Sequence, residues 1–269
     1  MEQEQHVSSK YKNFQEFLDK EQYTEKSIKS YEKVFGENFV SPGGIDSTKL
    51  VTQHLKITPG QRILDVGCGI GGSAFYFANE FGASVHGIDL SSNMINIANK
   101  KKEKMAIKNV TFDITDCTTA EFEDESFDVI YSREVILHIK EKKALFQSFY
   151  KWLKPGGHIL ITDYCCTEKK WTNEFTSYVK SRGYFLQTVS LYAQQLKEVG
   201  FKIIEQVDNT EKFIYFLEKE LERIELIRKE EENEAFSEEI YQYRRKGWSE
   251  KIQRAKDNLQ TWGLVFASK

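Results

Sequence analysis

The sequence predicts a doubly wound α/β fold built on a mostly parallel sheet of seven strands, with N-terminal helices and a helical lid insertion. Three observations support this fold class. Short apolar runs of strand length alternate with helical stretches up to residue 162, and a glycine-rich turn follows the first run. A last apolar run closes the chain after a long helical excursion. Such alternation is typical of parallel sheets whose crossover helices cover both faces.

The alternating runs are rich in β-branched residues and too short for helices, which favours strands. They cover residues 62–66, 84–88, 110–114, 127–131 and 158–162. Helical patterns at 93–104 and 142–153 lie between them. The KPGG motif at 154–157 is expected to end the second helix, because proline cannot continue a helix and glycine permits the reversal. Later runs at 201–207 and 262–268 complete the seven strands.

Helical segments flank this alternation on both sides. The apolar spacing within residues 22–39 predicts a helix that ends at Gly36, and a second helix is predicted over 48–56 after the SPGG turn. A polar and aromatic helix at 171–183 is expected to cover the strand ends as a lid. A later helix carries an apolar stripe that we expect to pack in the core. Its members are Phe213, Leu217, Leu221, Ile224 and Ile227.

Composition and charge limit the classes of partner. The net charge is −3 with acidic and basic residues interspersed, so neither a nucleic-acid surface nor a polybasic membrane site is predicted. The N-terminus lacks the apolar core of a signal peptide, and no stretch approaches the roughly 18 apolar residues of a membrane span. We therefore expect a cytoplasmic monomer that acts on a small molecule.

Cysteines and histidines do not indicate a metal site. Cys68, Cys117, Cys165 and Cys166 lie on or beside expected strands without CxxC spacing, which is typical of reduced core thiols. The five histidines are scattered along the chain. Because metal sites need ligands at short, regular spacing, no metal is expected.

The glycine-rich turn at 64–72 marks a ligand site. Its sequence, LDVGCGIGG, lies between the first strand and the next helix, where Gly67 and Gly69 let a ligand approach backbone amides. The turn alone does not identify the ligand. Dinucleotide enzymes use a related turn, and some glycine turns only pack a helix on a strand.

Acidic residues at three successive strand ends favour S-adenosylmethionine. Asp65 suits the loop and the cationic methionine end of this cofactor, and would repel a pyrophosphate. Asp89 follows Gly67 at about the 20-residue spacing of a ribose-binding acid. Asp116 lies beyond the third strand and can accept a hydrogen bond from the adenine amino group. The alternative is that Asp89 and Asp116 cap the following helices.

This pattern resembles class I S-adenosylmethionine-dependent methyltransferases, including the LKPGG motif at 153–157. The resemblance covers about residues 63–163. It implies a Rossmann-like sheet and S-adenosylmethionine as cofactor, without metal, but it does not identify the substrate.

His138 is a candidate for the chemistry. An ammonium ion has no lone pair with which to attack a sulfonium, so an amine acceptor with a pKa of about 10 needs help to lose its proton. His138 lies past the carboxyl end of the fourth strand, the edge where open α/β sheets bind ligands. From spacing alone, a position on a helix surface explains this histidine equally well.

Motifs along nearly the whole chain resemble phosphoethanolamine N-methyltransferases, nearest to the single-domain protozoan type. They include QYT at 22–24, FGEN at 35–38, YSR at 131–133, ILH at 136–138, ITDYC at 161–165 and GWS at 247–249. The resemblance implies stepwise transfer of methyl groups from S-adenosylmethionine to the amine of phosphoethanolamine, giving phosphocholine. It also implies a single methyltransferase domain, 1–269, with a helical cap (1–57), a cofactor-binding core (58–164) and a lid and substrate-binding part (165–269).

The resemblance assigns roles to residues of this chain. Tyr23 and His138 would form a hydrogen-bonded catalytic pair that orients the amine and relays its proton. The implied cofactor-binding residues are Val40, Ser41, Asp65, Gly67, Gly69, Asp89, Leu90, Asp116, Cys117 and Arg133. The implied substrate-binding residues are Tyr31, Glu134, Tyr164, Tyr178, Arg182, Tyr184 and Lys251. Most of the second set would bind the phosphate, and Tyr31 could offer an aromatic face to the methylated ammonium.

Some of these roles have alternatives. Tyr178 and Arg182 are four residues apart on one helix face, which suits phosphate binding, but Arg182 and Lys251 could also be solvated surface charges. Tyr31 could simply pack the N-terminal helix. Glu134, Val40 and Cys117 stand where the protozoan pattern has Asp, Ile and Ile, and the longer Glu134 could alter the amine pocket.

Three other functions stay open at this point. One is a methyltransferase for another small amine or a sterol-like acceptor, although an apolar acceptor would leave Arg182 without a charge partner. Another is a non-catalytic S-adenosylmethionine-binding regulator, because fold alone does not establish chemistry. A nucleic-acid methyltransferase fits poorly with the acidic charge balance.

Overall fold

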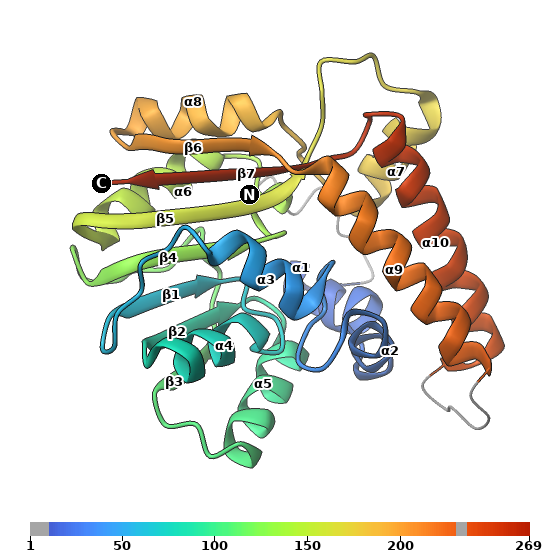
Figure 1. Cartoon of the computed structure of the whole chain (residues 1–269), viewed down its shortest axis with the longest axis horizontal. Coiled ribbons are helices and arrows are strands. Elements are labelled where there is room, and N and C mark those ends of the chain that lie inside the picture. The colour runs from blue at the N-terminus through green and yellow to red at the C-terminus, as the bar shows by residue number, and fades with distance from the viewer. Residues whose placement is uncertain (1–10, 230–235) are drawn as a thin grey trace.

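The computed structural model describes residues 11–229 and 236–269, and its centre is a seven-stranded sheet of order β3-β2-β1-β4-β5-β7-β6 (Figure 1). The first five strands are parallel to one another, whereas β7 runs antiparallel between β5 and β6. Their bounds are β1 (Arg62–Val66), β2 (Ser84–Asp89), β3 (Val110–Ile114), β4 (Phe127–Arg133), β5 (Leu153–Cys165), β6 (Lys202–Asp208) and β7 (Thr261–Ser268). The predicted doubly wound, mostly parallel sheet is confirmed.

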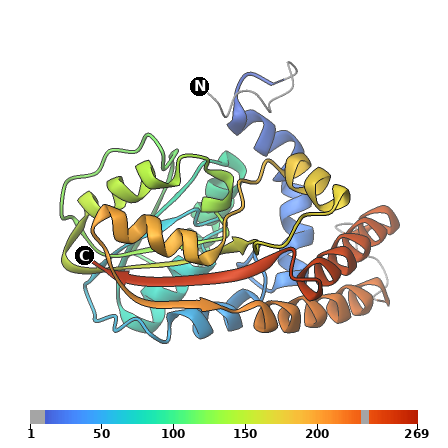
Figure 2. The same ribbon diagram turned by 90° about the horizontal axis from the view of Figure 1, so that it is seen from above.

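Helices cover both faces of the sheet, as Figure 2 shows. Successive strand residues point to opposite faces, so Ile63 packs in one core cluster and its neighbour Leu64 in the other. The Ile63 cluster includes residues of α3 (Gly44–Thr52), α4 (Gly72–Phe81) and α5 (Ser92–Lys104). The Leu64 cluster includes residues of α6 (Lys142–Trp152) and α8 (Val189–Val199).

The remaining helices gather beyond the carboxyl ends of the parallel strands (Figure 1). They are α1 (Phe14–Phe17), the π-helix η2 (Leu18–Gln22), α2 (Glu25–Phe35), α7 (Asn173–Arg182), α9 (Thr210–Lys229) and α10 (Glu238–Lys256). The predicted apolar stripe of α9 does pack in the core, with Phe213, Leu217, Ile224 and Ile227 buried and Leu221 partly buried. These helices enclose the strand edge where ligands bind in open α/β sheets.

Several predicted boundaries are wrong. The helix expected to begin at about residue 22 is α2, which begins only at Glu25, after the π-helix η2 has ended at Gln22. The helix expected over 48–56 is α3, which ends at Thr52 and begins early because Gly43 adopts a left-handed φ of 76° directly before the first helical residue, Gly44. The KPGG motif does not form a separate connection, since β5 already begins at Leu153. The register of β5 against β4 shifts between Phe127 and Val129 of β4, so the KPGG residues form an irregularity within strand β5.

The cysteines are free thiols, and Cys68, Cys165 and Cys166 are buried while Cys117 is partly buried. Across residues 11–229 and 236–269, no helix combines the length and apolar character needed to cross a membrane.

Candidate active site

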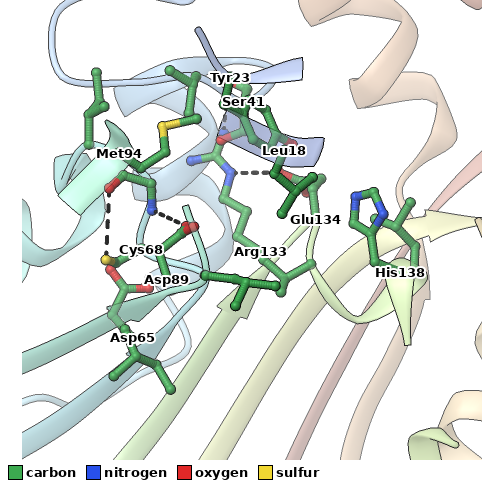
Figure 3. A pocket seen from close by; sticks show the side chains of 18 of the residues that line it. Leu18, Tyr23, Ser41, Asp65, Cys68, Asp89, Met94, Arg133, Glu134 and His138 are labelled. Atoms are coloured by element: carbon green, nitrogen blue, oxygen red, sulfur yellow. Dashed lines mark hydrogen bonds and ion pairs between the residues drawn. The ribbon is translucent and has the colours of Figure 1, made fainter. Parts of the chain in front are cut away.

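One pocket at the carboxyl ends of the strands is lined by all the sequence-predicted site residues except Tyr178. Figure 3 shows Asp65, Cys68 and Asp89 on one side of this pocket and His138 on the other, with Arg133 and Glu134 between them. Residues from η2, α2, the segment before α3, the ends of β1, β2, β4 and β5, and α7 and α10 all contribute. The fold therefore brings together side chains that are far apart in the sequence.

The glycine-rich turn lines the pocket and needs glycine for its backbone conformation and close packing. Gly67 has a φ of 73°, and a Cβ atom there would lie 2.0 Å from Cγ2 of Val135, so only glycine fits. Gly69 also has a positive φ, and its amide donates to Oδ2 of Asp89 at 3.0 Å. The turn leads into the N-terminus of α4, where free amides attract negative or polar groups.

Asp65 is a buried carboxylate that lacks a complete set of partners. Its side chain is 2% exposed, and Oδ2 accepts no hydrogen bond within the described structure. Burial and the nearby Asp89 carboxylate raise the pKa of Asp65 to about 7, although Arg133 opposes this shift. The glycine turn is hydrogen-bonded by Asp89 and not by Asp65, so the predicted loop-ordering role belongs to Asp89. An orphaned buried carboxylate oxygen is suited to bind a cation.

Asp89 and Asp116 differ in the hydrogen bonds that they accept within the protein. Asp89 accepts hydrogen bonds from the amides of Gly69 and Ser91, while Ser91 itself caps α5. The simple capping alternative is therefore wrong for Asp89. Asp116 accepts from both the amide and the hydroxyl of Thr118, at 2.8 and 2.7 Å, so it does stabilise a local turn. Both residues still line the pocket.

Arg133 directs its donors to the protein rather than into the pocket. Its guanidinium donates to Glu134, to the carbonyl oxygens of Ser41, Pro42 and Gly44, and to the hydroxyls of Ser47 and Thr48. These acceptors engage both terminal nitrogens and Nε, which is the full donor set of an arginine. Arg133 thus fixes the segment that carries Val40 and Ser41 on the pocket wall.

Glu134 is held in an unusual backbone conformation with its carboxylate fully engaged. Its φ is 53°, a left-handed value that is uncommon for a residue with a side chain. The carboxylate accepts from Arg133, from Thr162 Oγ1 at 3.1 Å and from Trp262 Nε1 at 2.8 Å. Burial raises the pKa of Glu134, while Arg133 counteracts that effect. The result is a fixed carboxylate on the pocket wall.

His138 ends the short 3₁₀ helix η3 (Ile136–His138) that follows β4. Its Nδ1 atom is buried and has no hydrogen-bond partner in the described structure, and its ring packs edge-on against Tyr184 with centroids 5.1 Å apart. Burial, Arg182 and Lys142 lower the pKa of His138 to about 3. The imidazole is therefore neutral at physiological pH, and its Nδ1 atom has hydrogen-bonding capacity that the described residues do not use.

Tyr23 lies between η2 and α2, and it lines the same pocket. Its backbone is fixed by the Leu18 carbonyl and by the side-chain amide of Asn93, which donates to the Tyr23 carbonyl at 2.9 Å. Burial raises the pKa of Tyr23. Among the described residues, no hydrogen bond joins Tyr23 to His138, so the expected pair lines the same pocket without the predicted hydrogen bond.

Cations and phenols form the other end of the pocket. Arg182 Nε donates to the Tyr184 hydroxyl at 3.3 Å, and Lys251 Nζ lies 3.5 Å from the Tyr164 hydroxyl. Neither Arg182 nor Lys251 has a carboxylate within ion-pair distance in the described residues. The interpretation of Arg182 as a solvated surface charge is wrong, because its side chain faces the pocket. This cluster can accept an anion.

Two tyrosines are placed differently from the prediction. Tyr31 lines the pocket, but the Arg244 guanidinium covers one ring face at 3.5 Å from the centroid, so that face cannot receive a substrate ammonium. Burial opposes the shift, but Arg244 and Arg182 together lower the pKa of Tyr31. Tyr178 lies behind the pocket wall, where Arg254 covers its ring at 3.7 Å and Tyr184 packs against it.

Sequence reasoning missed several residues of this site. Leu18, Ile70, Met94 and Leu137 line the pocket as apolar wall. Lys142 and Glu220 are buried charges close to it, at 1% and 5% exposure. A lysine at a helix start or a glutamate in a charged helix gives no sequence signal for burial, because both types are usually exposed. Within the described residues, no cluster of three or more potential metal ligands occurs.

Comparison with known proteins identifies the family. A methyltransferase domain model matches residues 57–233. Phosphoethanolamine N-methyltransferase 1 of Arabidopsis thaliana is 47% identical over 98% of this chain and 54% of its own length. The phosphoethanolamine N-methyltransferase of Plasmodium falciparum is 42% identical over 94% of this chain and 95% of its own length.

A solved structure supports the same relationship. Phosphoethanolamine N-methyltransferase 2 of Haemonchus contortus, in complex with phosphomonomethylethanolamine and S-adenosylhomocysteine, aligns with a TM-score of 0.90 and 38% identity. The alignment covers 97% of this chain and 61% of that chain. This chain thus spans about half the length of its plant relatives and nearly all of the Plasmodium protein. The chain belongs to the phosphoethanolamine N-methyltransferase family, on a class I methyltransferase fold.

Proposed function

We propose that this protein transfers methyl groups from S-adenosylmethionine to the amine of phosphoethanolamine, stepwise to phosphocholine. One observation supports this proposal most strongly. A single pocket has an acidic end, formed by Asp65, Asp89 and Asp116, and a cationic and phenolic end around Arg182 and Lys251. A cofactor with a cationic amino acid part matches the first end, and a phosphate dianion matches the second.

The residues at the glycine-rich turn fit S-adenosylmethionine. The orphaned Oδ2 of Asp65 would accept from the ammonium of its methionine part, and Gly67 keeps the turn in the left-handed conformation that packs against Val135. Asp89 would accept from the ribose hydroxyls, and Asp116 with Cys117 and Leu90 would hold the adenine. When bound, this cofactor supplies an electrophilic methyl group on a sulfonium. We propose Val40, Ser41, Gly69 and Arg133 as the rest of this subsite.

The cationic end would anchor the phosphate of the substrate. Arg182 offers a planar fork of donors, Lys251 a point charge, and Tyr164 and Tyr184 phenolic donors. Tyr31 would contribute its hydroxyl rather than its ring face, which Arg244 covers. Tyr178 would act indirectly by supporting Tyr184. Fixing the phosphate places the amine near Glu134 and His138 and supplies orientation to the displacement.

Proton removal from the amine would involve His138. Because its pKa is lowered to about 3, the imidazole is neutral and does not repel an approaching ammonium. Its unpartnered Nδ1 could accept a hydrogen bond once the ring or the substrate adjusts. We propose that Tyr23 acts on the same amine from the cap, so that residues 1–57, 58–164 and 165–269 work as one domain.

A sterol-like acceptor is a poorer match, since it would leave Arg182 and Lys251 facing an apolar molecule. A purely regulatory role would not require an unpartnered, neutral histidine beside the anion-binding cluster.

Substitution of Arg182 tests the phosphate subsite. We expect Arg182→Met to raise the KM for phosphoethanolamine about 10- to 100-fold, because a charge-assisted hydrogen bond contributes about 1.5–3 kcal/mol. Turnover of free ethanolamine, measured in parallel, should change little. Lys180→Met is the matched control, since Lys180 is an exposed cation on the same helix. Equal effects of Arg182→Met on both acceptors would contradict phosphate binding by Arg182.

A further inference from the structure

We infer that Lys142 is a positioning residue that fastens the turn carrying His138 to the segment carrying Tyr184. This inference deepens the proposed function, and its kinetic part rests on that function. Lys142 is the first residue of α6, and the side chain is 1% exposed. No role was assigned to it by the sequence motifs or by the pocket lining.

The ammonium of Lys142 joins two distant chain segments. Its Nζ donates to the carbonyl oxygen of Ile139 and to the carbonyl oxygen of Phe185, the latter at 2.8 Å. These carbonyls belong to the residues that directly follow His138 and Tyr184. One cation therefore sets the separation between the backbone of a proposed catalytic residue and that of a proposed phosphate ligand.

A backbone contact and a ring contact complete this connection. The Phe185 amide donates to the Leu137 carbonyl at 2.7 Å, so the residues on both sides of His138 are tied to the same segment. The rings of His138 and Tyr184 then meet edge-on at 5.1 Å. Because His138 Nδ1 has no hydrogen-bond partner of its own, these contacts are what orients the imidazole.

The burial of Lys142 needs such an explanation. Burying an ammonium is unfavourable unless it is well hydrogen-bonded, and a hydrocarbon side chain would fill the same space without that cost. In the described residues, no carboxylate forms an ion pair with Lys142. Among carboxylates, Asp163 acts on it most strongly, but the Asp163 oxygens accept from the Tyr192 hydroxyl and the Tyr164 amide, and the centroid of the Tyr192 ring lies 5.7 Å from Lys142 Nζ. The two carbonyls are therefore its direct partners.

The charge of Lys142 has a second effect on the site. Together with burial and Arg182 it lowers the pKa of His138, which favours the neutral imidazole. The connection that orients His138 thus also disfavours its protonation.

Hydrogen exchange of the Phe185 amide tests the connection without any need for catalysis. The variants are Lys142→Met, which keeps the size but removes the donors, and Lys143→Met, its exposed neighbour that pairs with Glu198. We expect exchange of the Phe185 amide to be about 10- to 100-fold faster in Lys142→Met and unchanged in Lys143→Met. Unchanged protection in a folded Lys142→Met protein would overturn the inference. If that variant does not fold, Lys142→Leu, which also removes the donors, replaces it with the same criterion.

Kinetics in a double-mutant cycle separate positioning from general damage. Lys142→Met should lower kcat on phosphoethanolamine about 10- to 100-fold, with S-adenosylmethionine affinity within about twofold of wild type. In a His138→Ala background the same change should have little further effect, because Lys142 acts through His138. If Lys142→Met lowered kcat by the same factor in the wild-type and His138→Ala backgrounds, Lys142 would not act through His138. Absence of phosphoethanolamine turnover by the wild type would refute the proposed function instead, and the exchange experiment would still decide the role of Lys142.

Discussion

Asp65 combines burial, an unpartnered oxygen and a position at the end of β1. Burial and Asp89 raise the pKa of Asp65 to about 7, so in the free protein a large fraction of this carboxyl is protonated at neutral pH. A neutral carboxyl cannot pair with the ammonium of S-adenosylmethionine. Cofactor binding should therefore be linked to release of a proton from Asp65.

The pH dependence of cofactor affinity tests this linkage. Between pH 5.5 and 7 we expect the Kd for S-adenosylmethionine to fall as pH rises, by up to about tenfold per pH unit, because ionised Asp65 is the binding form. Above the pKa of about 7 the Kd should level off. Calorimetric titration at several pH values measures it. Asp65→Asn should bind weakly with a flat profile, exposed Asp46→Asn should behave as wild type, and a flat wild-type profile would contradict the account.

The positions of some site residues could be predicted from the sequence, whereas the contacts of others could not. Strand ends predicted that Asp65 and Asp89 lie at one edge of the sheet, and the family resemblance added His138 and Arg182 to the same site; all four line one pocket. The sequence could not show that Arg133 directs its donors to residues 41–48, that Arg244 covers Tyr31, or that Lys142 is buried. Those facts depend on tertiary contacts between segments far apart in the chain.

At the scale of elements, the π-helix η2 is attached to the N-terminus of α5 through the side chain of Asp19. Asp19 accepts from the hydroxyls of Ser91 and Ser92, both at 2.6 Å, and from the amides of Ser92 and Asn93. A carboxylate at the start of α5 is favoured by the free amides and by the helix dipole. Since Asn93 also holds the Tyr23 carbonyl, this contact fixes the segment that carries Tyr23.

Removal of the Asp19 carboxylate should loosen that segment. In Asp19→Ala we expect hydrogen exchange of residues 18–28 to be about 10- to 100-fold faster, because charge-assisted hydrogen bonds to an anion contribute about 1.5–3 kcal/mol. Mass spectrometry of peptides from this region measures the change. Asp46→Ala, at an exposed position of α3, serves as the comparison. Equal protection in the two variants would mean that Asp19 does not anchor the cap.

The bounds of an element were predicted best where the sequence pattern alone identifies a strand. Residues 62–66 and 110–114 are β1 and β3 with the predicted bounds, because both are short β-branched runs and, in the edge strand β3, buried Val110 and Phe112 alternate with exposed Thr111 and Asp113. The early start of α3 could not be predicted, since the Gly43 turn and the contacts of Arg133 with Gly44 and Thr48 set it. The bounds of α10 were not predicted, because charged residues predominate in this helix and few apolar positions mark its buried face.

At the scale of the whole molecule, Glu220 of α9 links three regions. Its carboxylate accepts from the Gly43 amide at 2.5 Å and from Trp248 Nε1 of α10 at 2.8 Å, and its charge acts on Lys251. Trp248 in turn packs against Phe35 of α2. The N-terminal cap, the loop before α3 and the phosphate end of the pocket therefore meet at one buried carboxylate.

Loss of this carboxylate should destabilise the whole domain. Glu220→Ala would leave two buried donors without acceptors, so we expect the free energy of unfolding to fall by about 2–4 kcal/mol. Glu218→Ala removes an exposed ion pair with Lys256 and should cost less than about 1 kcal/mol. Urea denaturation of both variants gives the comparison. A change of similar size in the two would show that Glu220 has no special role in stability.

The most direct test of the proposed function is transfer of labelled methyl from S-adenosylmethionine to phosphoethanolamine and to free ethanolamine. We predict labelled, phosphorylated products up to phosphocholine, with little label on ethanolamine. His138→Ala should lower kcat about 10²- to 10⁴-fold, whereas His54→Ala, a surface histidine that pairs with Glu205, should match wild type. Equal labelling of both acceptors, or no labelling while the cofactor still binds, would contradict phosphoethanolamine N-methylation by this chain.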